Sequence, residues 1–81
     1  MPVLPISQHA LIHQLPFGVL LTNRFGMVVE VNDVASNRLG TTESDAVGRS
    51  LGSVLADTGV APIRSVPLRV WGRIEGEIVL V

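Results

Sequence analysis

Apolar and polar residues follow a strand-like pattern in the first half of the chain, and it predicts a β-hairpin. Residues 18–22 and 27–31 are rich in β-branched and aliphatic side chains, which suit a pleated, half-buried surface. Between them, Asn23 can bond its own backbone two residues on, and Gly26 can adopt a positive φ. Residues 18–32 are therefore expected to fold as two strands joined by a tight turn.

Short helical segments follow this hairpin. Residues 33–39 have apolar positions at helical spacing, and a short turn of helix and a third helix at 51–56 are expected after them. Small polar residues and glycines stand at the starts and ends of these segments, as helix caps require. The residues assigned to these roles are Asn32 or Asp33, Gly40, Thr42 with Asp45, Gly48 and Ser50.

The last third of the chain returns to a strand pattern. Residues 64–71 and 75–81 are rich in β-branched residues, which predicts a second hairpin with its turn at 72–74 or close by. Together the segments predict an α+β domain, in which an antiparallel sheet carries short helices on one face.

These segments together resemble a PAS domain over residues 11–55. The family usually has aspartate where Asn23 stands, a glycine at Gly26 and a signature asparagine at Asn32. The resemblance implies a PAS-like fold, but the family has five strands and a longer helix before the terminal hairpin. Here only residues 57–63 fill that interval, with 60–63 as the place for a residual strand. The middle of the domain is therefore abbreviated, and a ligand cavity is in doubt.

Strand parity in the terminal hairpin predicts which residues face outward. Val66, Leu68 and Val70 share one side of their strand, which we assign to the core beneath the helices. Trp71 would then point outward beside Arg69. The competing interpretation is that Trp71 packs under the N-terminal helix of its own chain.

That N-terminal helix is expected at residues 8–15, after a proline-broken lead, so that residues 1–15 precede a PAS-like domain at 16–81. Leu11, Ile12 and Leu15 form its apolar stripe, which needs an apolar surface to cover. We predict an interface made of this stripe with Arg69 and Trp71, since tryptophan and arginine are enriched at binding hot spots.

Composition limits the remaining possibilities. The chain has 81 residues, 47% of them hydrophobic, a net charge of −1 and no cysteine, which indicates one small domain without disulfides or thiolate metal ligands. We recognise no signal peptide and no apolar run of membrane-spanning length, so a cytoplasmic location is expected. The arginines of the terminal hairpin are offset by Glu75 and Glu77, so nucleic-acid binding is not expected.

The sequence offers little for catalysis or cofactors. His9 and His13 are four residues apart, a spacing that can place two imidazoles on one metal, but the sequence shows no third ligand. Haem-binding and flavin-binding members of the family need a histidine inside the fold or a reactive cysteine, respectively, and neither is evident. We therefore expect no haem, flavin or catalytic metal, and no enzyme activity.

The resemblance implies a signalling module, which works either by protein interaction or by sensing a small molecule. We favour interaction, through homodimerisation or docking of a partner, as the N-terminal input domain of a larger bacterial-type protein. The chain also resembles the N-terminal modules of diffusible-signal-factor receptors, cyclic-di-GMP enzymes of quorum sensing that dock on a signal synthase of enoyl-CoA-hydratase type. The alternative is a sensor that binds an apolar ligand in a residual pocket lined by Leu39, Val54 and Val70.

Overall fold

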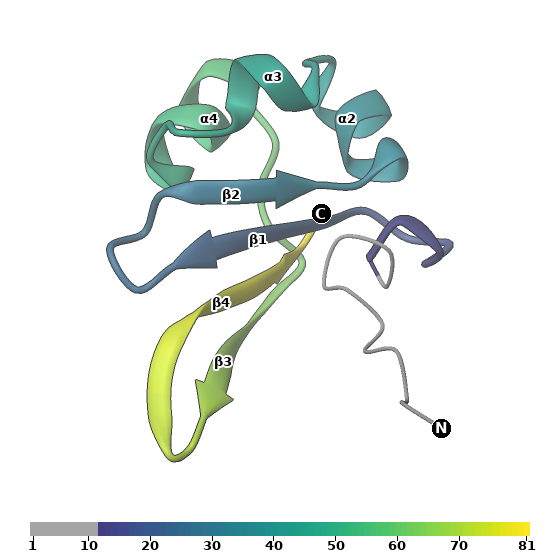
Figure 1. Cartoon of the computed structure of the whole chain (residues 1–81). Coiled ribbons are helices and arrows are strands. Elements are labelled where there is room, and N and C mark those ends of the chain that lie inside the picture. The colour runs from purple at the N-terminus through teal and green to yellow at the C-terminus, as the bar shows by residue number, and fades with distance from the viewer. Residues whose placement is uncertain (1–11) are drawn as a thin grey trace.

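The computed structural model describes residues 12–81, and these fold as one four-stranded antiparallel sheet with three short helices. The strands lie in the order β2-β1-β4-β3, so β2 and β3 form the two edges. Figure 1 shows the helices gathered beside β2, with the β3–β4 hairpin extending away from them. The strands are β1 (Val19–Asn23), β2 (Val28–Val31), β3 (Arg64–Val70) and β4 (Arg73–Leu80), and the helices are α2 (Asp33–Leu39), α3 (Glu43–Ala46) and α4 (Leu51–Thr58).

The β1–β2 turn has the geometry that its residues favour. The Asn23 side-chain oxygen accepts hydrogen bonds from the backbone N–H groups of Phe25 and Met27, at 2.9 and 3.1 Å. Gly26 has a φ of 79°, and its N–H donates to the Asn23 carbonyl at 3.0 Å. The first predicted hairpin is therefore present, with its turn between Asn23 and Met27.

The three helices begin at the polar residues that the sequence assigned as caps. The side chains of Asn32, Thr42 and Ser50 each accept a hydrogen bond from a backbone N–H three residues on, which satisfies a donor that the helix itself leaves unpaired. Helix α2 ends at Gly40, whose φ is 68°. Helix α4 continues to Thr58, two residues beyond the predicted end at residue 56.

Apolar side chains pack on both faces of the sheet. On the face beneath the helices, Leu20 and Val79 are buried with Val54 of α4. On the opposite face, Val19 and Leu21 pack with Ile12, from the segment before the sheet. Because neighbouring residues of a strand point to opposite faces, β1 and β4 contribute to both cores. Each face of these two central strands therefore has an apolar cover.

The apolar side chains of β3 do not lie on the side of the sheet that the sequence predicts. Val66 pairs with Ile78, which packs with the cluster opposite the helices, so the assignment of Val66, Leu68 and Val70 to the core beneath the helices is wrong. The register also shifts between Leu68 and Arg69, which breaks simple parity before Val70. The reason for the error is that β4 is apolar on both sides, so alternation alone could not select the side that faces the helices.

The link from α4 to β3 contains no residual strand at residues 60–63, because these residues are irregular. The N–H of Ile63 donates to the Leu80 carbonyl at 2.7 Å and leads directly into β3. Within residues 12–81, none of the helices is long and apolar enough to cross a lipid bilayer.

Candidate functional site

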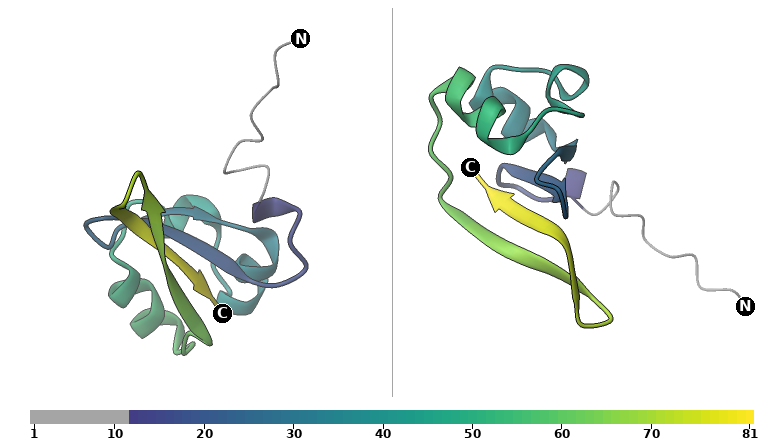
Figure 2. Two further views of the ribbon diagram at one scale, coloured as in Figure 1. Left: turned by 90° about the horizontal axis from the view of Figure 1, so that it is seen from below. Right: turned by 90° about the vertical axis from the view of Figure 1, so that its left-hand side faces the viewer.

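The β3–β4 hairpin exposes apolar side chains that the rest of the described domain does not cover. Along β3 every residue is exposed except Leu68, which is half-buried. Figures 1 and 2 show why: the helices lie over the other half of the sheet, and the hairpin projects beyond them. The exposed large apolar residues of this region are Ile63, Val66, Val70, Trp71 and Ile74.

The tip of the hairpin is a two-residue turn made of Trp71 and Gly72. Val70 pairs with Arg73 on either side of it, and the φ angles of the two central residues are 52° and 77°. Two positive φ angles are typical of the type I′ turn, in which Asn-Gly is the favoured pair. The bulky Trp71 therefore occupies a left-handed conformation that costs a non-glycine residue about 1–2 kcal/mol.

Trp71 is 98% exposed, so the described residues give its side chain no cover, and the first half of the predicted N-terminal helix lies outside them. The sequence placed Trp71 inside a strand, and it lies in the turn instead. Arg69 and Arg73 flank it in the sequence and are also exposed. An aromatic ring bordered by cationic side chains therefore stands at the far end of the hairpin.

The other predicted interface residues lie at a distance from this tip. Ile12 is buried against Val19 and Leu21, and Leu15 packs beside it, so both cover the sheet of their own chain. Leu11 lies outside the described residues, as do His9 and the rest of the first half of the predicted helix at 8–15. The described residues of the predicted interface thus fall into two groups. Ile12 and Leu15 form a cover on the sheet, and Arg69 and Trp71 are exposed.

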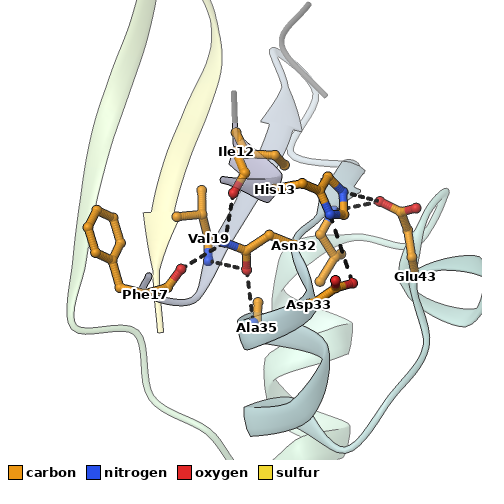
Figure 3. Close-up of polar contacts among 9 residues, drawn as sticks. Ile12, His13, Phe17, Val19, Asn32, Asp33, Ala35 and Glu43 are labelled. Atoms are coloured by element: carbon orange, nitrogen blue, oxygen red, sulfur yellow. Dashed lines mark hydrogen bonds and ion pairs between the residues drawn. The ribbon is translucent and has the colours of Figure 1, made fainter. Parts of the chain in front are cut away.

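Asn32 holds that cover in place (Figure 3). It is only 1% exposed, and its side-chain N–H groups donate to the carbonyls of Ile12 and Phe17, at 3.0 and 2.7 Å. Its side-chain oxygen accepts from the N–H groups of Val19 and Ala35, at 3.0 and 2.9 Å. All four hydrogen-bonding positions of the amide are therefore used, and they join the first described segment, β1 and α2.

The residues proposed for a ligand pocket do not come together. Leu39 and Val54 are buried in the core beneath the helices, whereas Val70 is exposed next to the hairpin turn. No cavity is found in the part of the chain that the structure describes. A pocket lined by these three residues is therefore not present in this structure.

A grouping that sequence spacing could not predict lies near the β2 edge. His13, Glu30 and Glu43 come from three separate segments, and one potential ligand atom of each lies within 4.8 Å of the others. Figure 3 shows His13 between the carboxylates of Asp33 and Glu43. His13 therefore lies against the fold, rather than ahead of it as the sequence suggested.

Comparison with known proteins identifies one family. The family model described as the PAS fold matches residues 8–68, which is most of the chain. No curated protein matches the chain.

Proposed function

The chain belongs to the PAS family, and we propose that it is a non-enzymatic signalling module that docks a protein through its β3–β4 hairpin. PAS domains are signalling input modules. The finer proposal is that this module works by protein contact, in the cytoplasm, as the N-terminal input domain of a larger protein. The observation that carries it is the uncovered hairpin with Trp71 at its tip.

The apolar surface of the hairpin supports docking. Val66, Val70 and Ile74 are exposed together with Trp71 on one short hairpin, and exposed apolar residues that gather in one place mark interaction sites. The burial of such a surface by a partner removes it from water at a gain of about 25 cal/mol per Å² of apolar area. The partner surface must therefore be apolar where it meets the hairpin.

The charges at the tip of the β3–β4 hairpin indicate which residues the partner should present around the apolar contact. Residues 69–74 contain Arg69 and Arg73 and no acidic residue. A partner that presents an apolar pocket with acidic residues at its rim would match both features, since complementary charge favours the correct partner and speeds its approach. Tryptophan and arginine are also the residue types most enriched at binding hot spots.

The conformation of Trp71 supports a functional role for the side chain. Its φ of 52° is unfavourable for a large residue, and asparagine or glycine would relieve the cost. Strained positions of this kind cluster at functional sites. Trp71 therefore fits a role in docking better than a role in folding, because its exposed ring has no core to fill.

Two partners are consistent with the proposal. One is a second copy of the chain, and the other is a signal synthase of enoyl-CoA-hydratase type, if the chain belongs to a cyclic-di-GMP enzyme of the diffusible-signal-factor system. The sensor alternative lacks a supporting observation, because the residues suggested for its pocket lie apart.

Sedimentation equilibrium and calorimetric titration with the purified synthase test the proposal on wild type, Trp71→Ala and Phe25→Ala. Phe25 is a matched control, because it is an aromatic residue, 73% exposed, at the tip of the other hairpin. We expect Trp71→Ala to weaken self-association or synthase binding by about 2 kcal/mol, or roughly 30-fold, and Phe25→Ala to leave both unchanged. Equal behaviour of wild type and Trp71→Ala in both assays would show that the docking surface lies elsewhere.

A further inference from the structure

Three side chains with metal-binding atoms meet beside the edge strand β2. His13 comes from the segment before the sheet, Glu30 from β2 and Glu43 from the first residue of α3. One ligand atom of each lies within 4.8 Å of the other two, and all three residues are half-buried. The fold therefore brings one imidazole and two carboxylates together from distant parts of the sequence.

This donor set fits a particular class of ion. Two carboxylates at this separation repel each other, and a cation between them removes that repulsion. Calcium and magnesium prefer oxygen ligands alone, whereas imidazole nitrogen together with carboxylate oxygen suits divalent transition metals such as Zn²⁺. The three donors must move closer together to reach coordination distance, since their ligand atoms now lie up to 4.8 Å apart.

Neighbouring groups lie close to two of the three donors. The Nε2 atom of His13 lies 3.6 Å from the Glu43 carboxylate, and its Nδ1 atom lies 3.9 Å from the Asp33 carboxylate. Metal-binding histidines commonly direct their second nitrogen toward a carboxylate, which fixes the orientation of the ring, and Asp33 is the carboxylate nearest Nδ1 among the contacts of His13. The Glu43 carboxylate also accepts a hydrogen bond from the N–H of Val31 at 3.2 Å, which holds it at the β2 edge.

We propose that His13 Nε2, Glu30 and Glu43 bind one divalent transition-metal cation, with Asp33 as the positioning residue for the imidazole. The sequence predicts no metal site, because it shows no third ligand beside the pair His9 and His13. The structure supplies two, and neither is His9. This site is independent of the proposed docking hairpin, which lies at the opposite edge of the sheet.

A bound cation would join three parts of the domain. His13 follows Ile12, which is buried against β1, so the cation would fasten this cover to β2 and α3. The metal would thus stabilise the closed arrangement of the first described segment, since a ligand that binds the folded state stabilises it. The site is structural in character and requires no catalytic step.

The test is calorimetric titration of the metal-free 81-residue domain with ZnCl₂, and a parallel titration with Co²⁺ followed by visible absorption. The variants are His13→Gln, Glu30→Gln, Glu43→Gln and Asp33→Asn, each checked for its fold by circular dichroism before metal is added. The glutamine at position 43 can still accept the Val31 hydrogen bond. The matched controls are Glu75→Gln, which removes a half-buried carboxylate from β4, and His9→Gln, which removes the other histidine.

We expect one Zn²⁺ per chain, with affinity reduced about tenfold or more by Asp33→Asn and reduced further by each of the three ligand variants. Both controls should bind as wild type does. The proposal is overturned if no saturable site is found, or if Glu30→Gln and Glu43→Gln bind as tightly as wild type. A loss of binding in His9→Gln with Glu43→Gln unaffected would also overturn it, because the metal would then belong to the histidine pair.

Discussion

The two halves of the sheet differ in how they are covered. Strands β1 and β2 lie beneath α2, α3 and α4, and the buried side chains of the described domain are concentrated there. The β3–β4 hairpin shares the same sheet but exposes nearly all of β3 and the first two residues of β4. Since burial of apolar surface is the main stabilising term in folding, the first half should supply most of the stability. The second half carries the exposed apolar residues for which we propose a docking role.

The junction between the halves is tightly fitted. Gly76 of β4 pairs with Asn23 of β1, and a Cβ atom at this glycine would collide with the Thr22 carbonyl oxygen. β4 is thus held close against β1 before the hairpin departs from the helix-covered half. The hairpin is therefore packed against β1 at its base, even though its tip is exposed to solvent.

The largest effect is expected at Asn32, in the covered half. Asn32→Ala removes the α2 cap and leaves buried backbone groups without their side-chain partners, so we expect a loss of about 3 kcal/mol in the free energy of unfolding. Urea denaturation followed by circular dichroism measures it.

Asn32→Asp is the informative companion. It keeps an oxygen for the N–H groups of Val19 and Ala35, but it places a second carboxylate oxygen against the carbonyls of Ile12 and Phe17. We expect a loss at neutral pH at least as large as for Asn32→Ala, because like partial charges then face each other. A change below about 0.5 kcal/mol in either variant would contradict the role of Asn32 as the junction of the three segments.

The next prediction compares one valine from each half. Val54 is buried in the core beneath the helices, whereas Val66 is exposed on β3. We expect Val54→Ala to lower the free energy of unfolding by about 2 kcal/mol, because it removes buried methyl groups and leaves a cavity. Val66→Ala should change it by less than about 1 kcal/mol. Equal losses in the two variants would mean that the hairpin is covered in solution, as in a dimer.

The covered half could largely be predicted from the sequence. Asn32, Thr42 and Ser50 cap their helices through bonds to residues three positions on, so their roles depend on local sequence alone. The β1–β2 turn also depends on local sequence, because the two residues that determine its geometry, Asn23 and Gly26, lie within four residues of the chain. Capping and turn residues of this kind therefore predict the helices and the first hairpin in their correct order.

The exposure of the β3–β4 hairpin and the grouping of His13, Glu30 and Glu43 could not be predicted in the same way. Ile78 and Val79 of β4 are both apolar but face opposite sides of the sheet, so the pattern does not tell which side meets the helices. The meeting of His13 with Glu30 and Glu43 depends on tertiary packing across up to 30 positions of the sequence. Both features follow from long-range arrangement, for which one sequence carries no direct signal.

The change in stability expected at Trp71 is smaller than those at Asn32 and Val54, and its sign is opposite. Trp71→Asn creates the Asn-Gly pair that a type I′ turn favours, so we expect the free energy of unfolding to rise by about 1 kcal/mol. The same variant removes the proposed anchor, so self-association or synthase binding should weaken by about 2 kcal/mol.

If Trp71 serves docking at a cost to folding, as we propose, then stability and partner affinity must change in opposite directions in Trp71→Asn. Urea denaturation gives the stability of the monomer at low concentration, and calorimetric titration gives the affinity for the partner. We expect Trp71→Asn to give a more stable domain that binds more weakly. A less stable domain with unchanged binding would contradict it, because Trp71 would then serve the fold.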